Sequence, residues 1–333
     1  MKKFIFLFFI LTGLSLHADV RQAKLKDGTD GIIFGDVAKL YAMSNIDYGS
    51  TIEFRNAKHK ITFIPPRREL FYNNVKIIPG YAPEKQLIKY SALTRWMRKR
   101  NQSNLVLSNS DWKSTLRPLL NPGCIQKHRV YTITLDAGHG GADTGALGKY
   151  SREKNITLKI ARRTAALLRA CNYNVVFTRA QDKTLSLDAR RAIQKAQKSD
   201  LFVSIHVNAV KQRSIHGIET FALTPADAPS TGGKKELQRN QSNNKDTNNF
   251  LLAYNLQRAL LSRTGAFDRG VKRARFAVLK DISAPGALVE VGFISNEREE
   301  RLLNSSAYIE KISRAIAEGI ISYHRTIVYS NAR

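Results

Sequence analysis

The sequence predicts an α/β fold: a mostly parallel, twisted sheet flanked by helices, preceded by a small α+β N-terminal domain. Three observations carry this prediction. Short apolar segments alternate with helical segments over residues 127–328, whereas residues 19–126 hold short strands and turns. The chain has 333 residues, which favours two domains, and 43% of them are hydrophobic, which suffices to bury a core.

The first 18 residues are typical of a secretory signal peptide. Lys2 and Lys3 form a basic start, an almost wholly apolar run covers residues 4–14, and the small residue Ala18 offers a cleavage point. The apolar run is too short to span a bilayer comfortably, and a short uncleaved anchor is the alternative. We therefore expect a periplasmic or otherwise extracytoplasmic protein that is cleaved near Ala18.

The chain is strongly basic, with 54 Lys and Arg against 27 Asp and Glu and a formal net charge of +27. In the cytoplasm this charge would favour a nucleic acid partner. Outside it, the available anions are membrane headgroups and the carboxylates of cell-wall peptides. We expect no nucleic acid partner, and electrostatic contact with a membrane surface is one use of the charge. The basic cluster at 95–100 is either a docking patch or a solvated helix face.

Residues 19–126 carry no catalytic motif and are expected to form an accessory domain. Strands are predicted at 50–55 and 59–64, and a hairpin at 69–77. This pattern resembles the small α+β modules at the front of some cell-wall hydrolases, which implies a role in wall binding or spacing. The sequence does not indicate a ligand for this domain. The two cysteines, Cys124 and Cys171, are too sparse for a disulfide framework, although an exported protein could pair them, and the sequence leaves their redox state open.

Residues 127–328 are expected to form the catalytic domain. Apolar patterns predict strands at 131–135, 174–178, 201–207, 217–222, 276–279 and 287–291, and helices at 156–171, 186–198, 251–263 and 306–323. Residues 224–249 are rich in Pro, Gly, Ser, Asn and Lys, which indicates a surface insertion between a strand and a helix.

Polar side chains near the carboxyl ends of these strands suggest a metal site. His139 follows the first strand in a glycine-rich loop with neither GxGxxG nor P-loop spacing, and His206 ends the strand 201–207. Taken singly, these residues have ordinary structural explanations. A lone buried histidine is usually a hydrogen-bonded core residue. Glu153 alone would be a glutamate in the first turn of a helix, where the helix dipole favours it. Together, two imidazoles and a carboxylate make a three-ligand set for Zn²⁺ with a fourth position for water.

Glu290 interrupts an otherwise apolar strand. A carboxylate buried in a strand is costly unless it is paired or lies near a metal ion. A structural role would need an Arg or Lys partner, whereas a catalytic role would need only a nearby metal-bound water.

Four ordered segments, 136–141, 152–155, 204–209 and 289–296, resemble the motifs of the type 3 zinc-dependent N-acetylmuramoyl-L-alanine amidases. The resemblance covers about residues 129–328. It implies that His139, Glu153 and His206 bind Zn²⁺ and that Glu290 is the general base. It also implies hydrolysis of the amide between the MurNAc lactyl group and L-Ala of the peptidoglycan stem peptide, in wall remodelling or cell separation.

The resemblance leaves regulation and the cleaved bond open. In some relatives a helix at the position of 224–249 blocks the zinc until an activator protein moves it. This insertion is short and weakly helical, so we expect a plain loop, with Glu236 as the residue that would otherwise act as a plug. Another cell-wall zinc peptidase, of the carboxypeptidase type, would share the ligands. A non-catalytic wall-binding protein would need a broken site, and a basic nucleic-acid binder is motivated by charge alone.

Overall fold

The computed structural model describes residues 20–86, 104–226, 228–233 and 238–330. The predicted signal peptide, the basic cluster at 95–100 and Glu236 lie outside the described residues. Within the described part of the chain, no helix is both long and apolar enough to cross a membrane.

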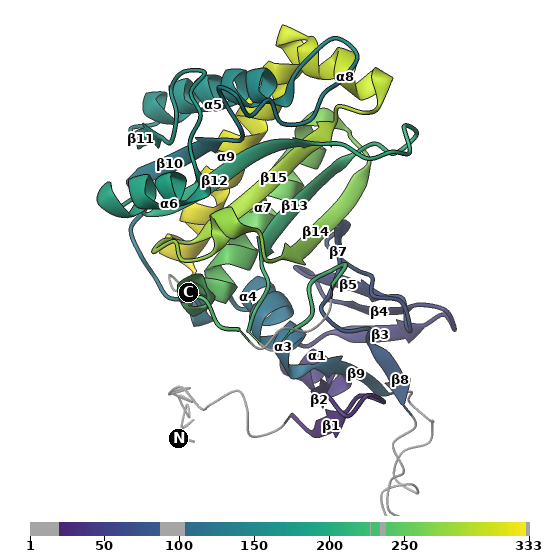
Figure 1. The fold of residues 1–333 in the computed structure, drawn as a ribbon. Coiled ribbons are helices and arrows are strands. Elements are labelled where there is room, and N and C mark those ends of the chain that lie inside the picture. Colours follow the sequence, from purple (N-terminus) through teal and green to yellow (C-terminus); the bar gives the residue numbers. More distant parts are fainter. Residues whose placement is uncertain (1–19, 87–103, 227, 234–237, 331–333) are drawn as a thin grey trace, which may run out of the picture.

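The second part of the chain is built on a mixed, mostly parallel sheet (Figure 1). Its strands are β10 (Thr132–Ala137), β11 (Asn174–Phe177), β12 (Leu201–Asn208), β13 (Ile218–Leu223), β14 (Asp268–Ala274) and β15 (Gly286–Phe293). They lie in the order β11-β10-β12-β15-β13-β14. All neighbours pair in parallel except β13 and β15, which are antiparallel. The predicted α/β class is therefore confirmed.

Helices cover the two faces of this sheet unequally. They are α5 (Glu153–Ala170), α6 (Leu187–Ala196), α7 (Asp246–Thr264), α8 (Glu297–Asn304) and α9 (Ser306–Tyr329), with the 3₁₀ turns η3 (Gln241–Lys245) and η4 (Ala277–Leu279). Ile205 and Val289 point into the main core, which α5, α7 and α9 close. Phe202 and Leu288 point to the opposite face, into a smaller cluster with residues of η4. Because side chains alternate along a strand, every second residue of β12 and β15 points to this less covered face, where polar side chains can lie.

Local sequence explains where several elements begin and end. The Ser186 Oγ accepts a hydrogen bond from the Ala189 N–H (3.1 Å), so Ser186 caps α6, the helix predicted at 186–198. Gly265, with φ 64°, ends α7 in the left-handed region that favours glycine. The prediction of a strand at 276–279 is wrong, because Ala277–Leu279 form the 3₁₀ turn η4. The strand of this region is β14, which lies just upstream. Charged side chains fill much of β14 and hide its strand pattern.

The N-terminal part of the chain extends the same sheet. Its elements are β1 (Gln22–Lys24), β2 (Asp30–Ile33), α1 (Phe34–Leu40), β3 (Ser44–Asp47), β4 (Ile52–Arg55), β5 (Lys60–Phe63), β6 (Leu70–Tyr72), β7 (Val75–Ile77), β8 (Glu84–Gln86), β9 (Asn104–Ser108), α3 (Asn109–Asp111), the π-helical turn η1 (Trp112–Leu116), α4 (Arg117–Leu120) and η2 (Pro122–Cys124). Strands β3 to β7 form an antiparallel meander, and β7 pairs with β14 through Ile77 and Val271. Strands β1, β2, β9 and β8 form a separate sheet. The predicted hairpin is present as β6 and β7, with positive φ at Asn73 and Asn74.

A buried arginine joins the two parts of the chain. Arg273 of β14 donates hydrogen bonds to the carbonyl of Ser114 (2.7 Å) and to that of Leu223 (3.1 Å). Its guanidinium also lies 4.6 Å from the centroid of the Phe250 ring. Burial lowers the pKa of Arg273 to about 10, which still leaves the side chain charged at neutral pH.

The segment 224–249 begins at the end of the sheet where β10 and β12 start, far from the carboxyl ends of these two strands. Because β13 is antiparallel to β15, Ala222 lies beside Ala287, near the amino end of β15. There Arg68 of the N-terminal part donates a hydrogen bond to the carbonyl of Ser230 (3.2 Å). Residues 246–249 form the first turn of α7.

We expect the Arg273→Met variant to lower the free energy of unfolding by about 2–4 kcal/mol, because two buried carbonyls lose their donor. Urea denaturation followed by circular dichroism measures this. Arg325→Met, at an exposed position of α9, is the matched control and should change stability by less than about 0.5 kcal/mol. Equal stability of the Arg273→Met variant and the wild type would contradict the role given to this side chain.

Candidate metal centre

His139 stands in the loop that follows β10, in an unusual backbone conformation. Its φ is 60°, in the left-handed region that non-glycine residues rarely adopt. The preceding Gly138 leaves no room for a side chain: a Cβ there would lie 2.7 Å from both ring nitrogens of His206. The Gly138 N–H donates to the Ile205 carbonyl (3.0 Å). The glycine thus lets the loop backbone approach the β12 histidine closely.

Glu153 is the first residue of α5 and is almost fully buried. Two backbone donors hold its carboxylate: the N–H of Ala146 at Oε2 (2.8 Å) and the N–H of Val207 at Oε1 (2.9 Å). The Nδ1 of His206 lies 2.9 Å from Oε1, and the Nε2 of His139 lies 3.2 Å from Oε2. The carboxylate is therefore fixed between the two imidazoles.

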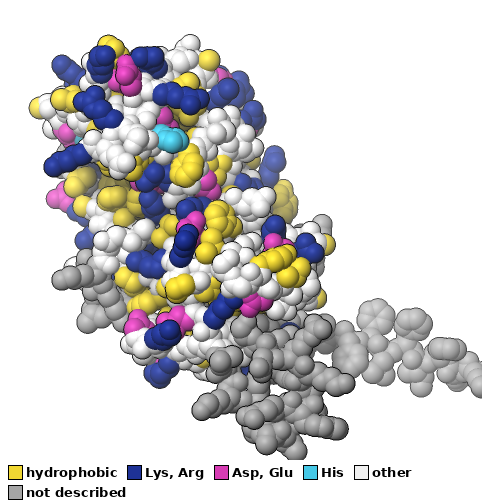
Figure 2. Space-filling view, turned by 90° about the vertical axis from the view of Figure 1, so that its right-hand side faces the viewer, with side chains coloured by type: hydrophobic (Ala, Val, Ile, Leu, Met, Phe, Trp, Pro, Cys, Tyr) yellow, Lys and Arg dark blue, Asp and Glu magenta, His cyan; other side chains and the backbone are white. Residues whose placement is uncertain are grey.

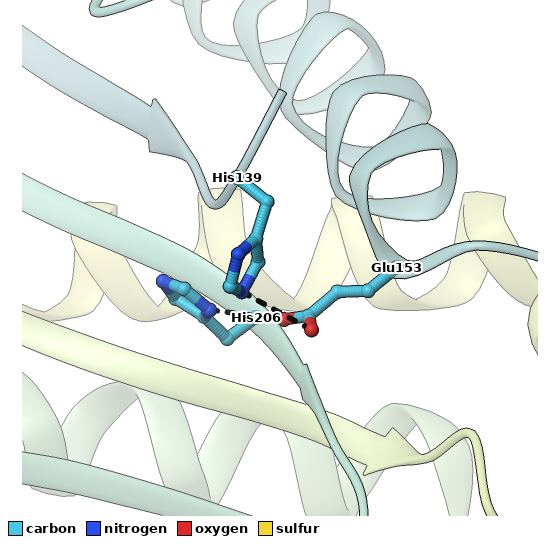
Figure 3. A group of neighbouring side chains, drawn as sticks. All are labelled: His139, Glu153 and His206. Carbon is cyan, nitrogen blue, oxygen red and sulfur yellow. Dashed lines mark hydrogen bonds and ion pairs between the residues drawn. The ribbon is translucent and has the colours of Figure 1, made fainter. Parts of the chain in front are cut away.

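The three side chains that the sequence predicted as metal ligands meet at one point, although they come from β12, the start of α5 and a loop (Figure 3). One potential ligand atom from each lies within 4.8 Å of the others. Burial alone would raise the pKa of Glu153, but hydrogen bonds from both histidines hold this pKa well below its ordinary range. The hydrogen bond to Glu153 raises the pKa of His139.

The donor set suits a divalent metal ion of the zinc type. Two imidazoles and one carboxylate are the ligands that three-residue zinc sites use. The Nδ1 of His139 lies 2.8 Å from Asp143 Oδ2, which leaves its Nε2 directed at the centre. A carboxylate behind a ligating histidine orients the ring and makes it more basic. Sequence analysis missed Asp143, although it stands four residues after His139.

A buried ion pair positions the His139 loop. Asp136 of β10 is fully buried, and its Oδ1 accepts a hydrogen bond from the Arg190 guanidinium of α6 (2.6 Å). The Ser204 hydroxyl donates to its other oxygen (2.6 Å). Burial raises the pKa of Asp136, but Arg190 and the hydroxyl donors bring it below its ordinary value. The same guanidinium donates to the carbonyl of His139 (2.7 Å), so one side chain ties the sheet to the loop.

Glu290 lies beside the metal-ligand group, on the neighbouring strand. It is paired in register with His206 of β12 and, on its other side, with Glu219 of β13. Its Oε2 is buried and has no hydrogen-bond partner among the described residues. Burial raises the pKa of Glu290 well above its ordinary value; the negative charges of Glu153 and Glu219 add to this shift, and Lys272 opposes it.

Glu219 is a further buried carboxylate that sequence analysis did not single out. It accepts hydrogen bonds from Asn208 (2.8 Å) and Arg269 (3.1 Å) and forms an ion pair with Lys272. The signal was available, because Glu219 interrupts an apolar strand just as Glu290 does. The difference is that Glu219 has partners for its charge, whereas Glu290 Oε2 does not.

The metal-ligand group opens into a cleft of about 520 Å³. His139, His206 and Glu290 line one side of it, and Leu187 and Phe276 are among the apolar residues that line the rest. Both apolar side chains are more than a third exposed. The cleft therefore combines a polar site with an apolar wall, as is typical of small-molecule and peptide sites.

Fold and site together define an amidase-type α/β domain, and comparison with known families confirms this. Residues 133–322 match the family model Amidase_3, described as N-acetylmuramoyl-L-alanine amidase. The match covers more than half of the chain, so the chain belongs to this family. The resemblance found in the four sequence segments is thereby confirmed.

Two curated relatives have the same family name. The amidase AmiC of Escherichia coli O6:H1 (strain CFT073) is 36% identical over 228 residues, which are 61% of this chain and 55% of AmiC. The amidase AmiA of Escherichia coli (strain K12) is 34% identical over 217 residues, 57% of this chain and 75% of AmiA. The chain thus spans about half of AmiC and three quarters of AmiA.

Solved structures confirm the fold of the second part. The catalytic domain of CwlV from Bacillus (Paenibacillus) polymyxa var. colistinus has a TM-score of 0.50 at 28% identity, covering 58% of this chain and 98% of that one. AmiC2 of Nostoc punctiforme gives 0.50 at 30% identity, with 58% and 96% covered. The CwlD amidase of Clostridioides difficile, solved with the GerS lipoprotein, gives 0.50 at 32%, with 58% and 98% covered.

We expect the Gly138→Ala variant to lose binding of a divalent ion such as Zn²⁺, because the added Cβ displaces His206 or the His139 loop. Isothermal titration calorimetry with ZnCl₂ measures this, with circular dichroism to verify folding. Gly35→Ala is the control, since a Cβ at Gly35 meets nothing within 4 Å. Unchanged affinity in the Gly138→Ala variant would show that the close approach is not needed.

Proposed function

We propose that this protein is a zinc-dependent N-acetylmuramoyl-L-alanine amidase. It hydrolyses the amide between the lactyl group of MurNAc and L-Ala of the peptidoglycan stem peptide. The observation that carries the proposal is a His-Glu-His group beside a buried glutamate, in a chain of this family. The family supports the identity of the amide, and the donor set supports hydrolysis with a metal ion.

In this proposal His139, Glu153 and His206 hold the metal ion. Their nitrogen and oxygen donors match the preference of Zn²⁺, and the pair of backbone N–H groups on Glu153 keeps its carboxylate ionised and oriented. Zn²⁺ bound there would supply Lewis-acid chemistry, polarising an amide carbonyl and making water more acidic. Asp143 and Arg190 are positioning residues, since they act on the ring and the carbonyl of His139.

Glu290 is the proposed general base. It takes a proton from water as the oxygen attacks the amide carbon, and it delivers that proton to the nitrogen of L-Ala as the C–N bond breaks. Its unpartnered Oε2, at the cleft and next to the strand of His206, supports this assignment. Glu219 cannot easily take the same role, because Lys272, Arg269 and Asn208 already occupy its oxygens.

The division of the chain into domains and the location of the protein outside the cytoplasm are part of the same proposal. We place the mature protein outside the cytoplasm, after signal cleavage near Ala18, with residues 19–126 as an accessory domain and 127–328 as the catalytic domain. The structure of CwlD is a complex with the GerS lipoprotein, so a related amidase binds a second protein. An activator protein is therefore included among the proposed partners. The proposed biological role is cell-wall remodelling or cell separation.

The test uses purified residues 19–333 on intact sacculi, with mass spectrometry of the released fragments. We expect free stem peptides and bare glycan. Metal removal with a chelator should abolish release, and Zn²⁺ should restore it. Glu290→Gln should lower kcat by about 10²–10⁴-fold and leave Zn²⁺ binding intact, because the variant loses only the base.

Matched variants separate the roles. His206→Ala should lose both Zn²⁺ binding and activity, whereas Glu318→Gln, a partly exposed side chain on α9, should change neither. Cleavage within the stem peptide instead of at L-Ala would move the activity to a carboxypeptidase-type zinc peptidase. Activity that survives the chelator or the Glu290→Gln change would refute the assigned mechanism.

A further inference from the structure

A second groove, of about 630 Å³, lies at the same edge of the sheet as the metal-ligand group. Three loops line it: 147–149 ahead of α5, 209–213 after β12, and 294–295 after β15. The first residues of α8 close its far side. Lys and Arg side chains crowd the upper part of the face in Figure 2, the end of the molecule that holds α8 in Figure 1.

The groove is a built surface, because its loops are hydrogen-bonded to each other. The Val210 N–H donates to Ser295 Oγ (3.1 Å), and Asn296, the N-cap of α8, donates from its side chain to the Arg213 carbonyl (2.9 Å). Ile294 donates to the carbonyl at the end of β12 (2.8 Å). These bonds hold the backbone of 209–213 in a fixed place beside β15.

The acidic residues of the groove are already paired. Glu300 accepts the backbone N–H groups of residues 149, 150 and 151, at 2.7–2.9 Å. Glu297 lies 3.8 Å from the Lys149 ammonium and 2.6 Å from the Arg301 guanidinium. Both acidic groups thus already have partners within the fold.

Two cations of the groove have no such partner. Lys211 and Arg213 are exposed, and within the described ranges no carboxylate forms an ion pair with either. Two unpaired cations in a groove attract an anion more strongly than isolated surface charges do, because the walls limit screening by water. The groove is therefore suited to an anionic ligand.

The groove is within reach of a substrate in the cleft. Ala209 stands three residues after His206, and Leu147 follows Ala146, whose N–H binds Glu153. Three extended residues span at most roughly 10 Å, so the groove begins within that distance of His206. A peptide that continues from a scissile amide covers the same distance in two to three residues.

We propose that this groove is a subsite for the stem peptide, in which Lys211 and Arg213 bind a carboxylate of the residues beyond L-Ala. The inference rests on the proposed function, since it names how that substrate is held. A stem peptide has free carboxylates on its acidic residues, one or two residues past the cleaved bond, and Lys and Arg pair with carboxylates through charge-assisted hydrogen bonds. The subsite thus selects acidic over amidated peptides.

The test measures binding, so that it does not depend on turnover. Two probes are compared by isothermal titration calorimetry: MurNAc with an acidic stem tripeptide, and the same compound with its side carboxylates amidated. All proteins are the full mature chain with Glu290→Gln, which slows cleavage of the probes. We expect tighter binding of the acidic probe, a preference that falls as salt rises. Adding Lys211→Glu and Arg213→Glu should reduce the preference by about tenfold and leave the amidated probe unaffected.

A charge-matched control is Lys195→Glu with Arg325→Glu. Both residues are exposed, on α6 and α9, at the edge of the sheet that is opposite to the groove. This variant should keep the full preference. Equal affinity of the two probes, or a preference that persists in the groove variant, would overturn the subsite. Failure of the wild type to release stem peptides, with the charge-dependent binding intact, would leave the subsite standing and count only against amidase activity of the purified protein without an activator.

Discussion

The buried ion pair of Asp136 and Arg190 is the interaction on which the site depends most. It connects the end of β10, the side chain of Ser204 on β12 and the helix α6, and it reaches the carbonyl of His139. Removing one partner of such a pair typically costs about 3–5 kcal/mol, because the other charge stays buried. The arrangement of the metal-ligand group is thus coupled to the stability of the sheet itself.

The sheet divides its two faces between packing and chemistry. One face supplies the apolar core under α5, α7 and α9, and the other carries His206, Glu290 and Glu219 on adjacent strands. Buried carboxylates on that face require compensation. Glu219 receives it from cationic and amide groups, and Glu153 from backbone donors and histidines. Of these three carboxylates, Glu290 is the one whose Oε2 is buried without a hydrogen-bond partner among the described residues, and in the proposed function this group accepts the proton.

Much of this organisation could be predicted from the sequence, because strand and helix patterns in the second part are strong. The class of fold and the nearness of His139, Glu153 and His206 followed from strand ends and ordered motifs. Strand β14 was missed, since its charged residues pair with neighbours that are distant in sequence, such as Lys272 with Glu219. The partners of Glu219 and the role of Arg190 also depend on tertiary contacts, which no local pattern encodes.

The pairing of β7 with β14 has a mechanical consequence. The Ile78 N–H donates to the Val271 carbonyl (2.9 Å), and the Lys76 N–H donates to the Asp268 carboxylate (2.7 Å). The meander and the strands of the second part therefore form one continuous sheet. A flexible linker would let the cleft sample many directions around an anchored accessory module. Here the strand pairing fixes the position of the N-terminal meander relative to the cleft. Under the proposed function, a surface that binds the N-terminal part would therefore also determine where on that surface the cleft meets its substrate.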